Sequence, residues 1–550
     1  MQVIDIHPDW WKWGTAEKRK ALTDYPNLKT HLEQRWNIGL NTRRDEPANF
    51  PVLANADNAN KLEILFGQFN FTTKADTRLI KSLGKSYKDL LFSVTRTAVR
   101  VVDGVVYPQN HEEIQRILEI ASREGVLVMP FGGGSNVCGD FDLPGADARP
   151  RLAMDMAKMN TLLHLDKVNH KATFQAGIYG PALEQMLNAQ GFTLGHFPQS
   201  FEYSTLGGWV VTRSAGQESS GYGRIEDIAI AIKVATPTGT LQTSSYEGDA
   251  AGVNLKGLYF GSEGMFGVVT EVTVRIHPLP KTKQWAIALF PNYQSGLNAL
   301  QSLVQQNIFP TVVRYSDEHE TFFLSLLSHE TPGFVTNIKA AVKSAVLKWK
   351  KLEQGCIMMI RFEDDCGEDC PKLEKAKRAF SDNGAMLLGD ALGKRWETSR
   401  FGLPYLRDDM MLRNVVVDTM ETVVPWNKID ELRKKLRLAL DTCTAFQNQQ
   451  GILLAHVSHV YTSCASIYFT VLTPMQTGNE MNQWREIKKT VTDTIVNNGG
   501  AVSHHHGVGK DHQPWYLQTT DEVTKRILQS VKQAVDPANI LNPGKLFDEA

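Results

Sequence analysis

The sequence predicts an α+β protein made of several units. At roughly 150 residues per domain, its 550 residues call for three or four units. From Val99 to about residue 280, short apolar runs alternate with helical segments and glycine-rich loops. After Pro280 the glycine clusters disappear and longer strands and helices follow. We therefore expect two mixed domains, with a further segment at each end of the chain.

Residues 1–93 predict a helical N-terminal extension. They are polar and rich in tryptophan, and prolines at positions 8, 26, 47 and 51 interrupt them. Helical patches are expected over residues 30–36 and 76–91.

Residues 94–280 predict the first domain, which opens with a β-α-β unit. Apolar side chains recur at helical spacing over residues 112–123, the helix stops at Gly125, and the apolar run 126–130 predicts a buried strand. A second helix, over residues 181–190, has proline at its first position. Strands are expected over residues 229–236 and 268–276.

Residues 281–503 predict an α+β second domain, and residues 504–550 a C-terminal return with a helix over 521–535. Strands are expected over 284–290, 356–362 and 466–472, and helices over 295–305 and 339–352. The last of these helices places Val342, Val346 and Trp349 on one side, flanked by lysines. This pattern could rest on a bilayer surface, although an ordinary solvated helix is the preferred interpretation.

Composition excludes several classes of protein. Lys+Arg total 59 against Asp+Glu 60, and 42% of residues are hydrophobic, which argues against disorder and against general nucleic-acid binding. The six cysteines are few and scattered, which indicates a reducing compartment. Cys366 and Cys370 form a Cys-x3-Cys pair with no second pair nearby, so loop thiols are preferred over a metal site.

No apolar run approaches the length of a spanning helix, and the first residues are acidic and aromatic, so we expect neither a spanning helix nor a signal peptide. The C-terminal residues are not a peroxisomal Ser-Lys-Leu address. We expect a cytoplasmic protein, with peripheral contact to a membrane as a further hypothesis.

Four loops concentrate glycine, serine and threonine between residues 130 and 267. The first, Phe-Gly-Gly-Gly-Ser-Asn at 131–136, follows a predicted strand and can aim several backbone N–H groups at an anion such as a pyrophosphate. It matches neither the Gly-x-Gly-x-x-Gly fingerprint nor a P-loop. The other segments, at 199–205, 207–216 and 261–267, are dense in the same small residues. Together they predict a long ligand that carries phosphates and hydroxyls.

As a set, Pro-Phe-Gly-Gly-Gly-Ser-Asn, Ser-Thr-Leu-Gly-Gly-Trp and Gly-Ser-Glu-Gly-x-x-Gly-Val-Val-Thr-Glu resemble the FAD-binding domain of the PCMH-type, or vanillyl-alcohol oxidase, flavoproteins. The likeness covers residues 94–280 and implies an FAD domain of two α/β subdomains followed by a cap domain. It implies that FAD contacts Pro130, Phe131, Gly132, Gly133, Gly134, Ser135, Asn136, Gln199, Ser200, Phe201, Glu202, Tyr203, Ser204, Thr205, Thr212, Arg213, Ser214, Ala215, Gly261, Ser262, Glu263, Gly264, Met265, Phe266 and Gly267. Many relatives tether the flavin through a histidine where this chain has Ser135 and Asn136, so we expect non-covalent FAD.

Three adjacent histidines, His504, His505 and His506, precede Gly-Val-Gly-Lys. On an extended segment His504 and His506 would face one way and His505 the other. An anion-binding or acid-base cluster is the favoured interpretation, and a solvated cluster and a metal site are alternatives. Taken alone, Tyr468 would be a packing aromatic in a strand, and Arg314 and Arg407 surface ion-pair partners.

In combination, these histidines, Ile-Tyr-Phe, Tyr-Leu-Arg-Asp and the Arg314 segment resemble the alkyldihydroxyacetonephosphate synthase family over nearly the whole chain. The resemblance implies that Tyr468 donates and accepts a proton, that Arg407 and Arg314 bind substrate, and that His504, His505 and His506 are essential. The implied reaction replaces the acyl chain of acyl-dihydroxyacetone phosphate by a fatty alcohol through a flavin N5 adduct, is redox-neutral, and forms the ether bond of ether lipids. A homodimer without a metal is expected.

The main alternative enzyme is an FAD-dependent D-2-hydroxyacid dehydrogenase of the D-lactate or glycolate type. Such enzymes usually carry Gly-His-x-Gly-Asp-Gly-Asn-x-His, and the corresponding region here, from Ala455 to Tyr468, lacks the Gly-Asp-Gly-Asn core. A non-enzymatic flavin or lipid carrier would leave the candidate site residues without a role.

Overall fold

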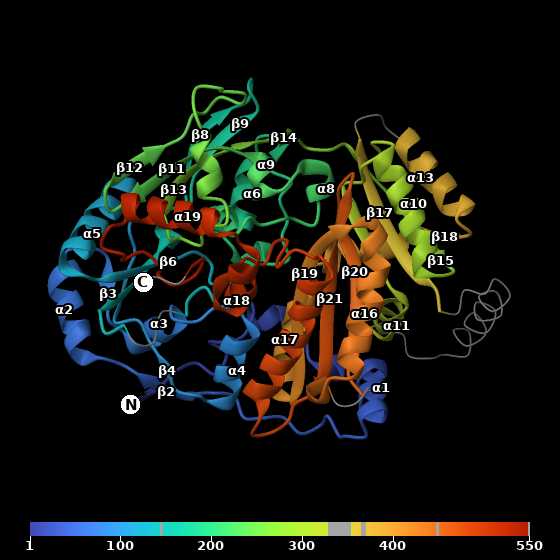
Figure 1. Cartoon of the computed structure of the whole chain (residues 1–550), viewed down its shortest axis with the longest axis horizontal. Helices are drawn as coiled ribbons and strands as arrows, with labels where there is room; N and C mark the ends of the chain where they lie inside the picture. Colours follow the sequence, from blue (N-terminus) through green and yellow to red (C-terminus); the bar gives the residue numbers. More distant parts are fainter. Residues whose placement is uncertain (143–146, 328–353, 365–369, 447–449, 548–550) are drawn as a thin grey trace.

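The computed structural model describes residues 1–142, 147–327, 354–364, 370–446 and 450–547. Two lobes lie side by side in Figure 1: a first lobe with four- and five-stranded sheets, and a second lobe with a seven-stranded sheet. The predicted helix 339–352, its proposed bilayer-facing side and Cys366 lie outside the described residues. Among the described cysteines, Cys138, Cys356, Cys370, Cys443 and Cys464 are free thiols.

The four-stranded sheet of the first lobe has the order β3-β5-β7-β6, with β5, β7 and β6 parallel. Its strands are β3 (Phe71–Thr72), β5 (Gly104–Val106), β6 (Leu127–Phe131) and β7 (Arg151–Asp155). Helices α2 (Ala56–Phe66) and α5 (His111–Glu124) pack their apolar sides on it. Asn110 caps α5 through the N–H of Glu113, and Gly125 ends it with φ 64°. The predicted β-α-β unit is confirmed.

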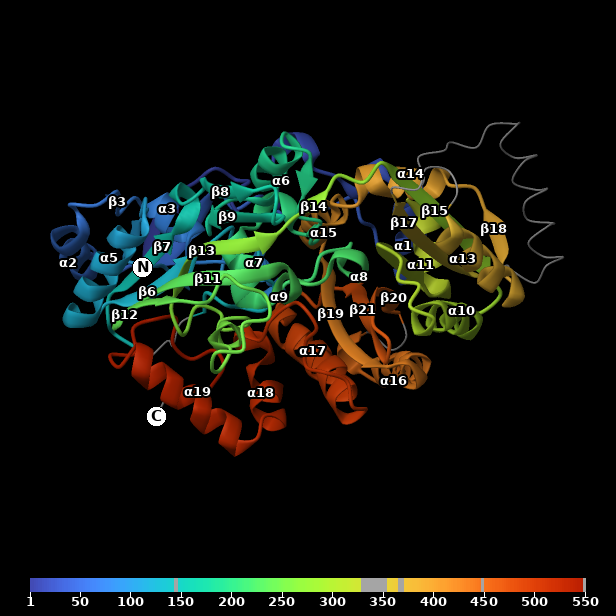
Figure 2. The same ribbon diagram turned by 90° about the horizontal axis from the view of Figure 1, so that it is seen from above.

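The five-stranded sheet of the first lobe is antiparallel and has the order β12-β11-β13-β9-β8. Its strands are β8 (Leu162–Asp166), β9 (Lys171–Gln175), β11 (Ala229–Thr236), β12 (Gly239–Gln242) and β13 (Val268–Arg275). Helices α6 (Gly180–Asn188), α7 (Leu206–Thr212) and α19 (Glu522–Val535) contribute to the hydrophobic core on this sheet. The chain therefore ends on the lobe that contains its glycine-rich loops, as Figure 2 shows.

The second lobe is built on an antiparallel sheet of order β18-β15-β17-β16-β20-β21-β19. The strands are β15 (Thr282–Phe290), β16 (Val312–Ser316), β17 (Cys356–Asp364), β18 (Met386–Leu388), β19 (Val415–Pro425), β20 (Ile452–Val460) and β21 (Cys464–Pro474). One hydrophobic core joins it to α10 (Tyr293–Gln305), α13 (Pro371–Asp382), α16 (Ile429–Asp441) and α17 (Glu480–Asn497). A separate core joins it to α1 (Pro26–Trp36), α11 (Glu318–Leu326) and α15 (Leu403–Leu412).

The N-terminal region differs from the expected helical extension. The expected helical patch 76–91 is two helices, α3 (Ala75–Ile80) and α4 (Tyr87–Thr95), because Ser86 starts a new helix by capping the N–H of Asp89. Strands β1 (Gln2–Asp5) and β2 (Asn49–Leu53) also occur there, and β2 pairs with β4 (Val99–Arg100) of the following segment. Since α1 packs on the second lobe, this region ties both lobes together.

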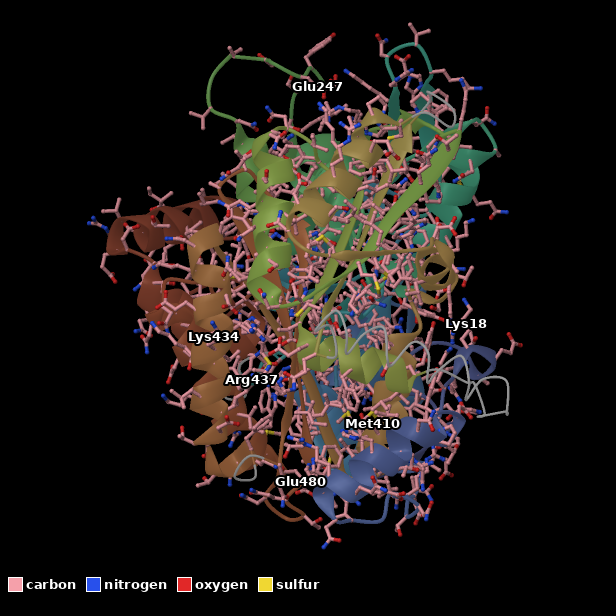
Figure 3. All side chains as sticks on the ribbon, turned by 90° about the vertical axis from the view of Figure 1, so that its right-hand side faces the viewer. Lys18, Glu247, Met410, Lys434, Arg437 and Glu480 are labelled. Carbon is pink, nitrogen blue, oxygen red and sulfur yellow. The ribbon has the colours of Figure 1, made fainter. Side chains whose placement is uncertain are left out.

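Further described elements are the two-residue strands β10 (Phe192–Thr193) and β14 (His277–Pro278) and the helices α8 (Ser219–Tyr222), α9 (Ile225–Ile228), α14 (Ala391–Ser399) and α18 (Gly509–Thr519). Side chains fill the space between the ribbons. Met410 lies buried among them, whereas Glu247 and Lys434 lie on the periphery (Figure 3). Within the described ranges, no helix combines the length and the apolar character needed to cross a membrane.

Candidate active site

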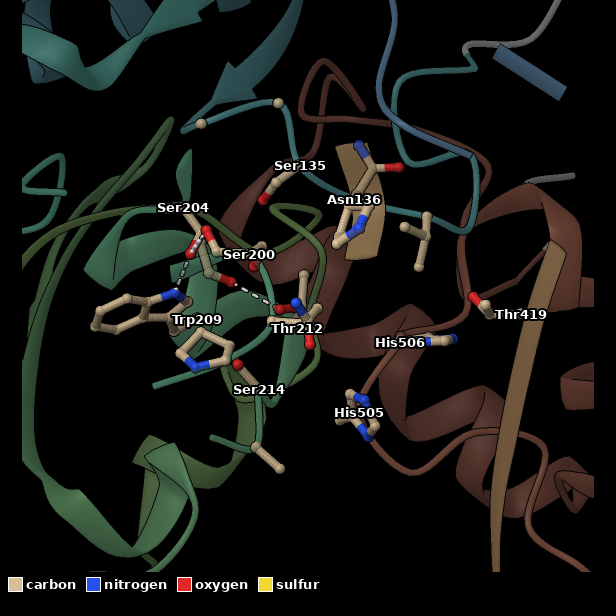
Figure 4. A pocket seen from close by; sticks show the side chains of 18 of the residues that line it. Ser135, Asn136, Ser200, Ser204, Trp209, Thr212, Ser214, Thr419, His505 and His506 are labelled. Atoms are coloured by element: carbon tan, nitrogen blue, oxygen red, sulfur yellow. Dashed lines mark hydrogen bonds between the residues drawn. The ribbon is translucent and has the colours of Figure 1, made fainter. Parts of the chain in front are cut away.

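One deep pocket lies between the two lobes. The first lobe contributes the predicted glycine-rich loops, and the second contributes side chains of its sheet and of α15. In Figure 4, His505 and His506 lie across the pocket from Ser204, Trp209 and Thr212. The pocket therefore joins the two sets of residues that the sequence singles out.

The loop after β6 needs its glycines because of the neighbouring backbone. A Cβ at Gly133 would lie 1.8 Å from the carbonyl oxygen of Tyr203, and one at Gly132 would lie 2.5 Å from Oγ1 of Thr205. Gly134 has φ 66°, where other residues are strained. The 132–136 loop thus packs directly on the 203–205 segment.

This loop presents unused hydrogen-bond donors to the pocket. Within the described part of the chain, the backbone N–H groups of residues 132–136 meet no acceptor. The buried Nδ2 of Asn136 and Oδ1 of Asn542, which also line the pocket, have no partner there either. Buried polar groups are rarely left unpaired, so these atoms fit a bound group with several oxygens and donors, such as FAD.

Most of the residues expected to bind the cofactor line the pocket: Pro130, Phe131, Gly132, Gly133, Gly134, Ser135, Asn136, Gln199, Ser200, Ser204, Thr205, Thr212, Ser214, Ala215, Glu263, Gly264 and Gly267. Outside its lining lie Phe201, Glu202, Tyr203, Arg213, Gly261, Ser262, Met265 and Phe266. Phe201, Met265 and Phe266 belong to the core of the first lobe. The half-exposed Arg213 pairs instead with Glu226.

Strand register places three functional side chains in a row across the second lobe. Tyr468 on β21 lies directly opposite His456 on β20 and Glu421 on β19. Directly opposite residues share one face of a sheet, and the rings of His456 and Tyr468 stack at 5.0 Å. Burial raises the pKa of Tyr468 to about 12, so its phenol keeps its proton at neutral pH.

The histidine segment is bent, which corrects the expected alternation of its side chains. Its backbone N–H groups turn toward Glu421. Neighbouring imidazole rings therefore lie close together, with centroids 5.3 Å apart for His504 and His505 and 4.8 Å apart for His505 and His506. His505 and His506 line the pocket. His504 instead bonds Tyr461 through Nε2 at 2.6 Å and stacks on His459.

Burial sets the charge of these imidazoles. It lowers the pKa of His505, and it lowers that of His506 well below the ordinary range, although Glu421 acts in the opposite direction. Both rings are therefore neutral at pH 7 and can accept a proton. The ligand atoms of His459, His504 and His505 also lie close enough to share a metal ion, so the metal alternative keeps a geometric basis.

The two predicted arginines both line the pocket but differ in what they contact. Arg314 donates to Glu320 at 2.7 Å, and the same carboxylate oxygen lies 2.9 Å from Nδ1 of His456. Burial opposes ionisation of Glu320, but Arg314 and His456 outweigh it and lower its pKa to about 2. Arg407 donates to the carbonyl of Lys85 at 3.3 Å, and its buried Nε has no hydrogen-bond partner within the described ranges but lies 3.9 Å from Oδ1 of Asp408. Arg407 is therefore less tightly paired than Arg314.

Sequence reasoning missed Glu320 and Glu421, and it treated His456 only as part of an absent motif. All three are single residues in strands or helices of ordinary composition, so no local pattern marks them. The only available indication was a carboxylate or imidazole in an apolar strand, as in Met420-Glu421-Thr422 and Ala455-His456-Val457.

Comparisons with known proteins agree with this geometry. The model of an FAD binding domain matches residues 102–245, which implies FAD, and that of the C-terminal domain of FAD linked oxidases matches residues 279–546. The chain is 34% identical over 540 residues to alkyldihydroxyacetonephosphate synthase of Dictyostelium discoideum, covering 97% of this chain and 85% of the relative. It is 33% identical over 478 residues to the Trypanosoma brucei brucei protein of that name, covering 86% and 78%.

A solved structure of alkyldihydroxyacetonephosphate synthase resembles the model with a TM-score of 0.81 at 30% identity, covering 95% of this chain and 93% of that one. The likeness spans both lobes and is not confined to the cofactor domain. The α+β fold class and the resemblance predicted from the sequence are confirmed. The chain belongs to the alkyldihydroxyacetonephosphate synthase family of FAD-linked enzymes.

Proposed function

We propose that this protein replaces the acyl chain of acyl-dihydroxyacetone phosphate by a long-chain fatty alcohol, releasing a fatty acid and forming an ether bond. The observation that carries the proposal is one pocket lined by the glycine loops, by Arg407, by Tyr468 with His505 and His506, and by a group of apolar side chains. The exchange adds the alcohol and removes the carboxylate, so it needs no net oxidant or reductant.

FAD would be held by the backbone donors of residues 132–136 and by Asn542. When bound, the flavin would supply the ring that carries the substrate carbon between departure of the carboxylate and arrival of the alkoxide. With Ser135 and Asn136 in place of a tethering histidine, FAD would be held without a covalent bond. After acid precipitation the yellow colour should therefore stay in the supernatant, and colour in the pellet would contradict this prediction.

The phosphate of the substrate would be bound by Arg407. Arg407 lines the pocket, its Nε has no hydrogen-bond partner within the described residues, and a guanidinium can bind two phosphate oxygens at once. Arg314 is already neutralised by Glu320, so it would orient His456 more than it would bind the dianion. The two neutral imidazoles would contribute hydrogen bonds instead of charge.

The long chains would lie against the apolar side chains of the pocket lining. These side chains come from α11, α15 and the second-lobe sheet, and they are Phe323, Leu324, Leu406, Met410, Leu454 and Leu472. Burying each methylene contributes roughly 0.8 kcal/mol, so such a lining favours long alcohols over short ones.

Proton transfer would be shared by Tyr468 and the histidines. One proton leaves the carbon beside the ketone and is later returned. A neutral His505 or His506 can accept it, and the protonated phenol of Tyr468 can donate one at neutral pH. Their rings lie together, with Tyr468 at 6.2 Å from His505 and 5.6 Å from His506.

The direct test is an assay of the FAD-loaded protein with acyl-dihydroxyacetone phosphate and labelled hexadecanol. We expect labelled ether product and one fatty acid released per ether formed. The alternative dehydrogenase is tested in parallel with D-lactate and a redox dye. Rapid flavin bleaching by D-lactate without ether formation would overturn the proposal.

The homodimer, the cytoplasmic location and the peripheral membrane contact stay predictions. Light scattering tests the first and cell fractionation the second. Liposome sedimentation tests the third, with Trp349 and three of the neighbouring lysines replaced; unchanged partitioning would contradict a role for that segment.

A further inference from the structure

Glu421 is a buried carboxylate that none of the sequence motifs contains. It lies on β19 with 3% of its surface exposed, and it does not line the pocket. It accepts hydrogen bonds from Oγ of Ser503 at 2.9 Å and from the N–H groups of His504, His505 and His506 at 2.8, 2.9 and 3.0 Å. One side chain thus binds four successive residues of the histidine loop.

A second buried carboxylate holds the other end of the same loop. Glu263, from the first lobe, accepts from the N–H of Val508 at 2.5 Å and from that of Gly509 at 2.9 Å. Gly507 and Gly509 both have positive φ, and a Cβ at Gly507 would lie 2.9 Å from Oε1 of Glu263. The glycines of the Gly-Val-Gly motif therefore allow the loop 503–509 to be hydrogen-bonded to Glu421 of the second lobe and to Glu263 of the first lobe.

The register of the sheet links Glu421 to the reacting groups. Because Glu421 and Tyr468 are cross-strand partners, the carboxylate that shapes the loop and the phenol share one rigid support. The imidazoles that this loop carries into the pocket are those of His505 and His506. A shift of the carboxylate would move both rings relative to Tyr468.

The charge of Glu421 also matters to these rings. Burial disfavours its ionised form, but the surrounding histidines and the N–H donors outweigh burial and hold its pKa well below the usual range. It is the carboxylate that raises the proton affinity of all three imidazoles. Several other charged or titratable groups lower it: Arg224 and Arg213 from the first lobe, Lys488 on α17 and His512 on α18. The ring of His459 on β20 also packs against them, at 4.9 Å from that of His504 and 5.3 Å from that of His505, as do the rings of Tyr461 and Tyr468.

We propose that Glu421 is a positioning residue of the alkyl transfer reaction, which fixes the bent histidine loop and its proton-accepting rings against Tyr468. The inference rests on the proposed function for its effect on rate, whereas the effect on the loop stands independently. All four donors meet Oε1 of the carboxylate, and the N–H of His504 also reaches Oε2 at 2.8 Å, so the negative charge strengthens each of these hydrogen bonds. In Glu421→Gln the bonds to the neutral amide oxygen would be weaker, and the NH2 group would replace Oε2 opposite the N–H of His504.

The experiment compares Glu421→Gln and Glu421→Asp with Glu184→Gln in the FAD-loaded protein. Glu184 is a matched control because it is a buried first-lobe carboxylate that accepts from Thr193 Oγ1 and from the N–H groups of Leu194 and Gly195, away from the pocket lining. For each variant, kcat, KM, FAD per chain and hydrogen exchange of the peptide spanning residues 503–509 are measured.

For Glu421→Gln we expect kcat to fall about 100-fold, with KM and FAD content nearly unchanged, since small displacements of reacting groups have effects of this order. Exchange of the loop amides should accelerate, and the acid limb of the kcat profile should move to lower pH. Glu421→Asp keeps the charge and should recover part of kcat. Glu184→Gln should keep the kcat and loop exchange of the unmodified protein.

The inference would be overturned if Glu421→Gln showed unchanged hydrogen exchange of the loop or unchanged kcat per bound FAD. It would also be overturned if Glu184→Gln lost as much kcat as Glu421→Gln. If Glu421→Gln does not fold, Glu421→Asp is tested instead, and wild-type loop exchange together with wild-type kcat in Glu421→Asp would overturn the inference. If the unmodified protein forms no ether, the proposed function fails, and loop exchange still decides whether Glu421 holds the histidines.

Discussion

The two sides of the pocket are built in different ways. The first-lobe side uses backbone N–H groups, glycines and small hydroxyl side chains from four loops. The second-lobe side uses long side chains from separate elements, with Arg314 on β16, Arg407 on α15, His456 on β20 and Tyr468 on β21. A cofactor that stays in place can be held by main chain, whereas a reacting substrate needs groups that carry charge or exchange protons.

Because the two sides are built differently, we predict that FAD binding and the reaction can be disrupted independently of each other. Replacing one side chain on the second-lobe side should stop the reaction and leave FAD bound. Disturbing the backbone of the first-lobe side should release FAD and leave the second-lobe groups in place. Substitutions of Tyr468 and of Gly133 test this separation.

The largest effect is expected for Tyr468→Phe. Losing a positioned proton donor typically costs about 10²–10⁴-fold in rate, so we expect kcat to fall about 1,000-fold. FAD absorbance per chain should not change, because Tyr468 lies on the other side of the pocket from the glycine loops. The measurement is ether formation per bound FAD.

Tyr315→Phe is the matched control for that variant. Tyr315 is fully buried in the same sheet, donates to the carbonyl of Tyr293 at 2.6 Å and lies outside the pocket lining. Its replacement should cost about 1 kcal/mol of stability and leave kcat unchanged. Near-normal ether formation by Tyr468→Phe would remove Tyr468 from the proposed chemistry.

A smaller effect, on the opposite side, is expected for Gly133→Ala. The added Cβ would meet the backbone carbonyl of Tyr203 at 1.8 Å, and a backbone atom cannot rotate away. Overpacking of this kind costs about 1–3 kcal/mol, so FAD affinity should fall roughly 10- to 100-fold. Flavin fluorescence during titration of the apoprotein measures the change.

Gly257→Ala serves as the control for the glycine substitution, since a Cβ there meets nothing within 4 Å and φ is not positive. Excess FAD should restore the kcat of Gly133→Ala, because its second-lobe groups are intact. An activity loss that saturating FAD does not repair would break the proposed separation of the two sides.

The same contrast explains what could be predicted from the sequence. Residues 130–136 form a continuous motif, so the cofactor side was recognisable, although Thr205 and Tyr203, which make Gly132 and Gly133 necessary, lie far away in the sequence. The end of a helix at Gly125 was likewise a local signal. The second-lobe side depends on the register of β19, β20 and β21, which aligns Glu421, His456 and Tyr468, and β19 is separated in sequence from the other two strands by α16.

The bend of the histidine loop shows most clearly what could not be predicted from the sequence. Three adjacent histidines suggest alternation along an extended segment, but Glu421, 83 residues earlier than His504, draws their N–H groups to one point. Likewise, the break between α3 and α4 was not predicted, although Gly84 and Ser86, a common capping residue, lie between the two helices. In both cases a hydrogen bond fixes the chain, from the N–H of His504 to Glu421 and from the N–H of Asp89 to Ser86.

The smallest expected effect is the pH dependence of kcat. Because the backbone donors of the first-lobe side do not titrate, any pH dependence of kcat should come from the side chains of the second-lobe side. Burial lowers the pKa of His505 and His506 below the ordinary 6.5, so their proton-accepting neutral form persists as pH falls through that value. Activity should therefore decline only below pH 6.5. On the alkaline side Tyr468, with its pKa raised to about 12, keeps its proton, so activity should stay level well past neutrality.

The measurement is kcat at saturating substrate, with FAD content recorded at each pH so that loss of cofactor is not mistaken for titration. A loss of activity as pH rises toward 6.5 would mean that the imidazoles act in their charged form, and the second-lobe side would then bind the phosphate by charge instead of accepting the proton.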